Sequence, residues 1–407
     1  MAGTDAVSNP RRTKDKKTTQ AAWHIITGEY PPQPGGVADY CAQLAHSLAV
    51  EGDVVHVWTP PGGQDSEYDR LVHIHRLPGH FDRLGLRELR RGLDASPAPR
   101  RILVQYVAGA FGYRAMNLPF SLSMALRRHE PMWVMFHEYA YPLGWRLKPQ
   151  HNLLGMVTSI LAGLLAWRAD RILVSTPSWI RKLPPFLRRS KHECITWLPI
   201  PSNIPVNHDP GASLKIRQRL LNGGRRTLLG HFGTYGPLIS GMLREILPML
   251  LAPAERAALL MGRGGEAFVE RMTGEHPHLK GRLFASGALE GAAMADHLKA
   301  CDMLVQPYDD GVTSRRGTLM AGLALGLPIV TNGGRSAEPS FAQEGAVAMA
   351  ATPDPLAIAA LAERTLASEE ERARLSRRAA SLYQEKFSIE HSIRTLRELA
   401  ARDEVAS

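Results

Sequence analysis

Short apolar runs alternate with segments of helical spacing along most of the chain. His24–Thr27 and Val54–Thr59 are typical of buried strands. Between them, apolar residues recur along Val37–Gly52 at positions that share one face of a helix. A strand, a glycine-containing loop, a helix and a second strand form a βαβ unit, which predicts a parallel sheet with helices packed on its faces.

This alternation continues on both sides of a proline-rich segment, Leu198–Pro205, which is the best candidate for an inter-domain linker. Before it, the pattern predicts strands at Arg101–Tyr106, Trp133–Phe136 and Arg171–Ser175, and helices at Leu118–Arg128 and Leu153–Trp167. After it, the pattern predicts strands at Thr227–Phe232, Ala257–Met261, Leu283–Ala285, Met303–Gln306 and Ile329–Thr331, and helices at Ile239–Leu251, Glu290–Lys299, Arg316–Leu325, Asp354–Tyr383 and Ile389–Arg402. Two such series predict two doubly wound α/β domains with a cleft between them, where ligands bind beyond the carboxyl ends of the strands.

The chain has 407 residues, enough for two or three domains. We expect a disordered basic tail at residues 1–20, an N-terminal domain at 21–205 and a C-terminal domain at 206–383. The formal net charge of +10 suggests an acidic partner, such as a nucleotide, a phosphorylated lipid or an anionic membrane. No nucleic-acid-binding motif accompanies the basic residues, so no nucleic acid partner is expected.

Cysteine usage and hydropathy bear on the compartment. Three cysteines lie far apart, at Cys41, Cys194 and Cys301. This spacing argues against a disulfide framework and a cysteine metal site, and it fits a cytoplasmic protein. The N-terminus lacks the apolar segment of a secretory signal, and the longest apolar run, Leu153–Trp167, is too short to span a bilayer comfortably. Because Arg168 and Arg171 follow that run, peripheral contact with the inner face of an anionic membrane stays open.

Two arginines, a glycine and a threonine stand where one predicted helix begins, at Arg315, Arg316, Gly317 and Thr318. The first backbone N–H groups of a helix are unpaired, and the helix dipole favours an anion there. Guanidinium groups add paired donors that match phosphate oxygens. We interpret this segment as a site for the diphosphate of a nucleotide-sugar. The alternative is an ordinary surface helix with solvated arginines.

Two further positions carry candidate chemistry. Gly35 and Gly36 follow the first predicted strand, where the lack of a Cβ lets backbone amides approach a ligand. They also lead into a helix N-terminus, although a tight turn without a ligand is the alternative. His137 and Glu138 directly follow another predicted strand, which places them at the cleft. The alternative for His137 is a structural hydrogen bond.

Together these segments resemble retaining glycosyltransferases of family 4, which have the GT-B fold. The resemblance rests on Tyr30–Tyr40, Phe136–Glu138, Ser175–Ser178, Gly230–Gly233, Leu260–Gly262, Gly287–Leu289 and Gly311–Thr331. The ending Tyr383–Ser388 looks like the family's tail, after which a helix within residues 384–407 crosses back to the N-terminal domain. Each segment alone is weak, but their order and spacing across residues 21–400 are specific.

The resemblance implies a donor site in the C-terminal domain that faces an acceptor site in the N-terminal domain. His137 would contact the donor sugar and stabilise charge as the leaving group departs, while Arg315 and Arg316 would hold the diphosphate. The other implied donor-binding positions are Gly35, Gly36, Gly262, Arg263, Leu289, Asp310, Ser314, Gly317 and Thr318. No metal and no cofactor are expected, because the arginines and the helix dipole would neutralise the diphosphate.

The chain departs from the family pattern at two positions. Many members carry two glutamates separated by seven residues, the second shortly before a Gly-x-Pro turn. Alignment on Gly326–Pro328 puts Thr313 and Ala321 at those positions, and neither is a carboxylate. Asp310 is a candidate replacement. The chain therefore resembles a divergent subgroup, in which the arginines expected to bind diphosphate are Arg263, Arg315 and Arg316.

The reaction that the resemblance implies is sugar transfer, with retention at the anomeric carbon, from a UDP- or GDP-linked donor to a hydroxyl acceptor. In that scheme the departing phosphate takes the proton of the acceptor, so no protein nucleophile is required. The alternatives are a binding subunit on the same fold, a sugar-nucleotide epimerase and a membrane-anchored assembly factor. The acceptor would be a glycan, a lipid-linked molecule or a small molecule. We expect the loops Gly79–Ser96 and Ala108–Leu118 to determine which acceptor is used.

Overall fold

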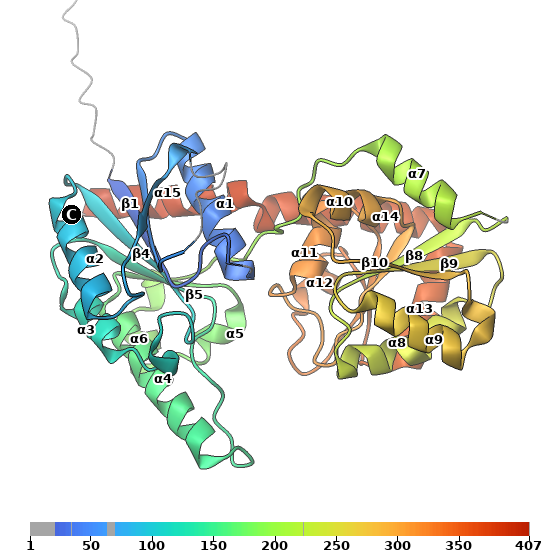
Figure 1. Cartoon of the computed structure of the whole chain (residues 1–407), viewed down its shortest axis with the longest axis horizontal. Helices are drawn as coiled ribbons and strands as arrows, with labels where there is room; N and C mark the ends of the chain where they lie inside the picture. Colours follow the sequence, from blue (N-terminus) through green and yellow to red (C-terminus); the bar gives the residue numbers. More distant parts are fainter. Residues whose placement is uncertain (1–20, 34, 63–69, 223, 407) are drawn as a thin grey trace, which may run out of the picture.

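Two α/β domains lie side by side in the computed structural model, which describes residues 21–33, 35–62, 70–222 and 224–406 (Figure 1). Each domain is built around one parallel sheet, and hydrophobic clusters pack on the sheets under the surrounding helices. The predicted basic tail at residues 1–20 lies outside the described residues.

The sheet of the N-terminal domain has seven parallel strands in the order β3-β2-β1-β4-β5-β6-β7. Their bounds are β1 Ala22–Thr27, β2 Val55–Thr59, β3 His73–Arg76, β4 Arg100–Tyr106, β5 Met132–Phe136, β6 Arg171–Val174 and β7 Ile195–Trp197. The helices of this domain are α1 Gly36–Val50, α2 Arg83–Ala95, α3 Leu118–Leu126, α4 Pro149–Arg168, α5 Pro177–Ile180 and α6 Pro185–Ser190.

The sheet of the C-terminal domain has six parallel strands in the order β10-β9-β8-β11-β12-β13. Their bounds are β8 Thr227–Phe232, β9 Arg256–Met261, β10 Leu283–Gly287, β11 Met303–Val305, β12 Ile329–Asn332 and β13 Ala348–Ala350. The helices that follow β7 are α7 Pro210–Leu220, α8 Pro237–Leu250, α9 Gly265–Glu275, α10 Gly291–Lys299, α11 Gly317–Ala324, α12 Ser340–Gln343, α13 Pro355–Ala367, α14 Glu369–Leu382 and α15 Ile389–Ala406.

Each sheet contains a point where the direction of its crossovers reverses. In the N-terminal sheet β1 pairs with both β2 and β4, and in the C-terminal sheet β8 pairs with both β9 and β11. Crossover helices diverge on either side of such a point and leave a crevice at the carboxyl ends of the strands. The fold therefore places the loops that follow β1, β4, β8 and β11 where ligands bind in such sheets.

Apolar strand composition explains why the sheets are parallel and buried. All five residues of β5 and all three of β11 are buried. A strand with helices on both faces must be apolar on both faces, so it appears in the sequence as a continuous apolar run rather than an alternating one. These runs are the reason that the central strands of both sheets were predicted close to their observed bounds.

Short edge strands and several helices were not predicted. Strands β3, β7 and β13 lie at sheet edges and have only four, three and three residues. The predicted helix Asp354–Tyr383 is two helices, because the side chain of Ser368 accepts a hydrogen bond from the Glu371 amide and begins α14.

The prediction of a loop at Gly79–Ser96 is wrong. Helix α2 occupies most of this segment, and the Asp82 carboxylate caps it by accepting from the amides of Leu84 and Gly85, both at 2.9 Å. Buried Leu89 and Leu93 hold the helix against the domain. Arg90 and Arg91, between these leucines, are on the exposed face of the helix.

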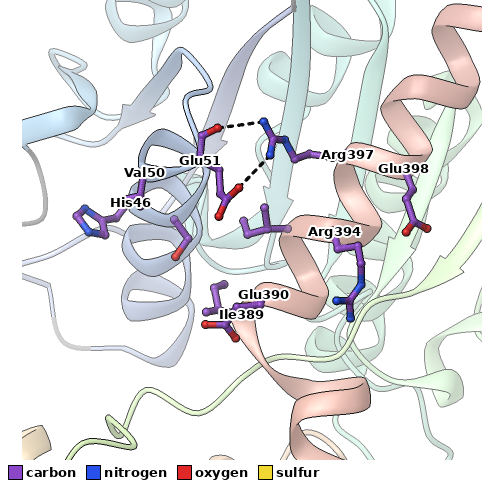
Figure 2. A pocket seen from close by; sticks show the side chains of 10 residues that line it. His46, Val50, Glu51, Ile389, Glu390, Arg394, Arg397 and Glu398 are labelled. Atoms are coloured by element: carbon purple, nitrogen blue, oxygen red, sulfur yellow. Dashed lines mark hydrogen bonds and ion pairs between the residues drawn. The ribbon is translucent and has the colours of Figure 1, made fainter.

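Helix α15 crosses back from the C-terminal domain and packs against α1. A groove of about 570 Å³ runs between the two helices, and Figure 2 shows Arg397 of α15 reaching Glu51 at the end of α1. Arg397 Nη1 lies 3.1 Å from Glu51 Oε2, and Arg171 Nε donates to Asp403 Oδ1 at 2.9 Å. Apolar residues of α15, including Leu396, belong to the core of the N-terminal domain. The last helix therefore ties the two domains together.

Four histidines form a stack on one face of the N-terminal sheet. His24, His56 and His73 are register neighbours on β1, β2 and β3. The ring centroids of His24 and His56 are 4.6 Å apart, and those of His56 and His73 are 4.8 Å apart. His75 lies 3.0 Å from His56 between ring nitrogens, and Trp58 Nε1 donates to His24 Nδ1 at 3.1 Å. Burial, together with the neighbouring histidines, lowers the pKa of His24 to about 3 and that of His56 to about 4.

This stack predicts that the protein loses stability in mild acid. The charges of Arg100 and Arg127 also lower the pKa of His24, whereas the charge of Glu88 acts to raise the pKa of His75. Because the folded pKa values are lowered, the unfolded chain binds more protons below pH 6.5, so stability is complete above that pH and falls toward pH 4. For one fully buried imidazole, the free energy of unfolding can fall by at most about 1.4 kcal/mol for each pH unit.

Urea unfolding at a series of pH values measures this dependence. His56→Phe keeps an aromatic ring in the stack and should flatten the decline between pH 6.5 and pH 4. His129→Phe, at an exposed position, is the matched control and should leave the slope unchanged. Equal slopes in the two variants would contradict the prediction.

Candidate active site

A cavity of about 580 Å³ lies between the two domains. From the N-terminal domain it is lined by Glu29, Gly36, Val37, Tyr40, Gln43, Val107, His137, Glu138, Ser175, Ile200, Pro201 and Asn203, and from the C-terminal domain by Phe232, Arg315, Gly317 and Thr318. Several of these residues directly follow the carboxyl ends of parallel strands, as ligand-binding residues do in this architecture. The predicted residues that the structure brings together here are Gly36, His137, Arg315, Gly317 and Thr318.

His137 follows β5 and is held rigidly at the cavity wall. Its backbone amide donates to the Tyr106 carbonyl at 3.0 Å, and its ring Nε2 lies 2.7 Å from Gln105 Oε1. The ring is buried, and burial, followed by the nearby charge of Arg315, lowers the pKa of His137 to about 3. At neutral pH the imidazole is therefore uncharged, with the Nε2 proton directed at Gln105 and a lone pair on Nδ1.

Arg315 extends from the C-terminal domain to the N-terminal domain. Its guanidinium carbon lies 5.1 Å from the centroid of the Trp179 ring, and its Nη2 lies 3.7 Å from Glu138 Oε1. The side chain is 44 % exposed, so its charge stays available to a ligand in the cavity. This arrangement places one cation of the predicted arginine pair at the cavity.

Arg316 takes a different path and lies outside the cavity lining. It is the N-cap residue of α11, pairs with the carboxylate of Asp310 and lies over the Tyr308 ring at 4.8 Å. The Asp310 carboxylate is thus engaged by Arg316 and also stands outside the lining. The pair shapes the loop before α11, whereas Arg315 faces the cavity.

The N-terminus of α11 opens into the cavity at Gly317 and Thr318. A Cβ added at Gly317 would meet nothing within 4 Å, so there is open space beside its Cα. The Thr318 hydroxyl lies 3.0 Å from the Tyr308 hydroxyl, which fixes its side chain. First-turn amides have no partner within their own helix, so they and Arg315 form a setting that favours an anion.

Sequence reasoning missed two carboxylates, Glu29 and Glu338, and the Tyr40 hydroxyl near this site, whereas it placed Glu138 at the cleft. Glu29 follows β1 and Glu138 follows β5, and both line the cavity. Burial raises the pKa of Glu29, and the charge of Glu138 raises it further. Tyr40 also lines the cavity, and its buried hydroxyl has no hydrogen-bond partner among the described residues. The signal was available, because acidic residues directly after predicted strands lie at the carboxyl edge of the sheet.

Glu338, the second missed carboxylate, lies between the two domains. Its Oε1 accepts from the Ser314 hydroxyl at 2.9 Å and from the Thr176 hydroxyl of the N-terminal domain at 3.4 Å. Burial raises the pKa of Glu338, and the hydrogen bonds from Ser314 and Thr176 oppose that rise. Ser314 is itself buried and holds Glu338 rather than lining the cavity.

Replacing Glu338 with alanine is expected to lower the free energy of unfolding by about 1–3 kcal/mol, because the buried Ser314 hydroxyl loses its acceptor. Glu338→Gln keeps an acceptor oxygen and should lose less. Chemical unfolding of both variants measures the difference. Glu344→Ala, at a carboxylate paired on the surface, is the control. A Glu338→Ala variant as stable as the parent would show that the contact contributes nothing.

The remaining predicted positions do not line the cavity. Gly35 is the N-cap residue of α1, next to the lining residue Gly36. Gly262 has φ +110°, and a Cβ there would lie 2.2 Å from the Gly233 carbonyl oxygen, so the loops after β8 and β9 touch at a position only glycine fits. Arg263 is exposed, and Leu289 is a partly buried residue packed against the core.

Within the described residues, no group of three or more histidine, cysteine, aspartate or glutamate side chains is arranged to hold a metal ion. Two of the three cysteines, Cys41 and Cys301, are buried, and burial raises the pKa of Cys41 to about 12. The polar groups at the cavity are an arginine, helix amides, carboxylates and a neutral histidine. This set suits a ligand that combines a phosphorylated part with a hydroxyl-rich part.

Comparison with known proteins shows the fold. No protein-family model and no curated protein matches the sequence. Solved structures match over nearly the whole chain: sucrose-phosphate synthase from Thermosynechococcus elongatus is 16 % identical with a TM-score of 0.68, covering 95 % of this chain and 100 % of its own. Anabaena Alr3699/HepE in complex with UDP and glucose is 16 % identical with a TM-score of 0.62, covering 94 % and 100 %.

A putative UDP-N-acetylglucosamine 2-epimerase from Listeria monocytogenes is 12 % identical with a TM-score of 0.53, covering 93 % of this chain and 94 % of its own. Two parallel-sheet, Rossmann-like domains joined in this way define the GT-B fold, and the sequence-based prediction of that fold is confirmed. At these identities the likeness defines the architecture alone.

Proposed function

We propose that this protein is a retaining glycosyltransferase of the family 4 type, which moves a hexosyl group from a nucleotide-diphosphate sugar to a hydroxyl acceptor without a metal. The observation that carries the proposal is the inter-domain cavity, onto which Arg315, the N-terminus of α11 and His137 converge. Alr3699/HepE, a protein of the same fold, is described in complex with UDP and glucose, which supports a nucleotide-sugar donor here.

The proposed chemistry uses the charge arrangement of the cavity. Negative charge grows on the phosphate oxygens as the bond to the anomeric carbon breaks, and Arg315 with the amides of Gly317 and Thr318 would stabilise it. The acceptor hydroxyl would attack from the face that the leaving group departs from and give its proton to the phosphate. No protein nucleophile is needed, so Thr313 and Ala321 at the usual glutamate positions do not prevent this reaction.

The N-terminal side of the cavity would hold the sugar and the acceptor. Neutral His137 offers a lone pair rather than a proton, so it would accept a hydrogen bond from a sugar hydroxyl and stabilise positive charge at the anomeric centre. Glu29 and Glu138 would supply the carboxylates that the family motif places elsewhere, and the Tyr40 hydroxyl would bond a ligand oxygen. The acceptor would be a glycan, a lipid-linked sugar or a small molecule.

A thermal-shift series with UDP, GDP, ADP and dTDP tests the donor site, because a ligand that binds only the folded state raises the melting temperature. We expect UDP or GDP to raise it most, and the matching monophosphate to raise it less, because Arg315 and α11 act on the diphosphate. Diphosphate release from the corresponding nucleotide-sugar, with and without acceptors, then tests transfer. No shift with any of the four would overturn the proposal.

Two alternatives are distinguished by the same assays. The structural likeness to a putative epimerase motivates the first: an epimerase would alter the donor sugar in the absence of any acceptor. The residues Thr313 and Ala321 motivate the second, a binding subunit, for which tight diphosphate binding would accompany complete inactivity.

A further inference from the structure

An exposed apolar stripe runs the length of helix α4. Its members recur at helical spacing on the solvent side, at Leu153, Met156, Ile160 and Trp167. Ile160 is 62 % exposed, while Leu161 and Leu165 on the opposite side belong to the core. A surface helix normally turns polar residues to solvent, so this stripe indicates a face that contacts a binding partner.

Helix α3 extends the apolar stripe sideways. It packs against α4 and exposes Leu118, Leu122 and Leu126, the last 74 % exposed. Arg128, just beyond α3, lies over the Trp167 ring with its guanidinium carbon 5.9 Å from the ring centroid. The two helices therefore present one continuous apolar surface with a cation at one end.

The loop before α4 adds the most exposed aromatic residue of the described chain. Trp145 is fully exposed, and Leu143 beside it is exposed as well. In Figure 1, α4 and this loop extend away from the body of the N-terminal domain. A projecting tip of this kind reaches a flat surface before the rest of the molecule does.

A strained turn stands at the start of α3. Tyr113, Arg114 and Ala115 have φ values of 51°, 53° and 72°, although none is glycine. Such a conformation costs about 1–3 kcal/mol for each residue and is kept mostly at functional sites. It presents the side chains of Tyr113 and Arg114 to solvent beside the apolar surface.

The charge of this surface has a single sign. Residues 105–129 and 139–169 contain no aspartate and no glutamate. Their exposed cations are Arg114, Arg128, Arg146 and Lys148. Arg168 and Arg171, the cations expected from the sequence to meet a membrane, are used internally: Arg168 Nε donates to the Arg127 carbonyl at 2.6 Å, and Arg171 pairs with Asp403.

We propose that the docking surface, formed by α3, α4, the turn at 113–116 and the loop at 141–148, binds the face of an anionic lipid bilayer. Apolar side chains would enter the boundary between headgroups and acyl chains, while the four exposed cations would meet lipid phosphates. A second copy of the chain is a poor occupant, because two such surfaces would bring like charges together, and the nearby acids Glu130 and Asp170 already pair with arginines of their own copy. No helix in the described part of the chain is long and apolar enough to cross a membrane.

One loop of the chain links the docking surface to the inter-domain cavity. The loop that carries Trp145 begins directly after Glu138, and the amide of Tyr141 in that loop donates to Thr158 of α4 at 3.2 Å. Binding would hold the cavity close to the lipid surface, where an amphiphilic acceptor would be found. Membrane binding itself does not depend on sugar transfer, so the two proposals can fail separately.

Vesicle flotation of the full chain tests the proposal without any nucleotide-sugar. We expect binding to phosphatidylcholine vesicles that contain about one-third phosphatidylglycerol, much weaker binding to phosphatidylcholine alone, and loss of binding between about 0.05 M and 0.5 M salt. The triple variant Trp145→Ser, Met156→Gln, Ile160→Gln should bind at least about tenfold more weakly. The matched control Leu214→Gln, Leu238→Gln, Leu356→Gln removes exposed apolar residues from the C-terminal domain and should bind like the parent.

A charge pair of variants separates local from overall electrostatics. Arg146→Glu with Lys148→Glu should abolish binding to the anionic vesicles, whereas Lys215→Glu with Arg219→Glu on α7 makes the same change in net charge and should retain it. Equal losses in both, or no binding by the parent at low salt, would overturn the proposal. Self-association that the Trp145 triple variant removes, without vesicle binding, would assign the surface to a second copy instead.

Discussion

Arg315→Ala is expected to weaken donor binding or turnover by about tenfold to a hundredfold. Arg315 is the cation that the structure places at the inter-domain cavity, beside the open N-terminus of α11. A single donor aimed at developing charge in a closed site contributes about 2.7–4 kcal/mol to the barrier. Because this guanidinium is 44 % exposed, solvent screens its charge, and we expect an effect below that range.

The matched variants make this prediction specific. Arg335→Ala removes an exposed arginine after β12 and should leave kinetics unchanged. Arg316→Ala is also expected to weaken the donor by about tenfold, but through a different route: it removes the pair with Asp310 and should lower the melting temperature as well. Steady-state kinetics and melting curves separate the two. Kinetics like the parent's in both Arg315→Ala and Arg316→Ala would end the diphosphate assignment.

His137→Ala is expected to lower turnover by about a hundredfold while donor affinity changes by less than about threefold. His137 is buried at the cavity wall and its ring is fixed by Gln105, so it is arranged to act on the reacting sugar rather than to hold the nucleotide. Single-turnover rates and calorimetric titration with the diphosphate measure the two quantities. Unchanged turnover would make His137 a structural residue.

The pH profile adds a second readout for His137. Because its pKa is lowered to about 3, the imidazole stays neutral across the range in which the protein is folded. The profile of the parent should therefore show no change of rate near pH 6.5 from this residue. Gln105→Leu removes the partner of Nε2 and should reduce turnover without changing the cavity charge. A limb near pH 6.5 that His137→Ala abolishes would contradict the lowered pKa.

The central strands and the fold were predictable from the sequence alone. Strand β8 was predicted at its observed bounds, and β5 and β9 within one residue, because strands buried on both faces are continuous apolar runs between helices. The edge strand β3, with the composition His-Ile-His-Arg, carries no such signal, since only pairing with β2 makes it a strand. Helix α2 was missed because its apolar residues are sparse among arginines.

In the candidate site, too, local features could be predicted from the sequence and tertiary contacts could not. Local sequence was enough to place Arg315, Gly317 and Thr318 at a helix start, and His137 after a strand, because both features depend on neighbouring residues. The sequence did not distinguish Arg315 from Arg316. Only the fold turns one toward Trp179 across the cavity and the other toward Asp310 within its own loop.

The sequence by itself determined two parallel α/β domains and an anion-favouring helix start, because periodicity and helix-end chemistry are local properties. The tertiary structure decided which carboxylates meet the site. Glu29 and Glu338 come from segments far apart in the chain, and chain folding alone brings them to the inter-domain region with Glu138. It also decided that Arg168 donates to the Arg127 carbonyl and that the apolar stripe of α4 is exposed, because burial depends on which elements pack against that helix.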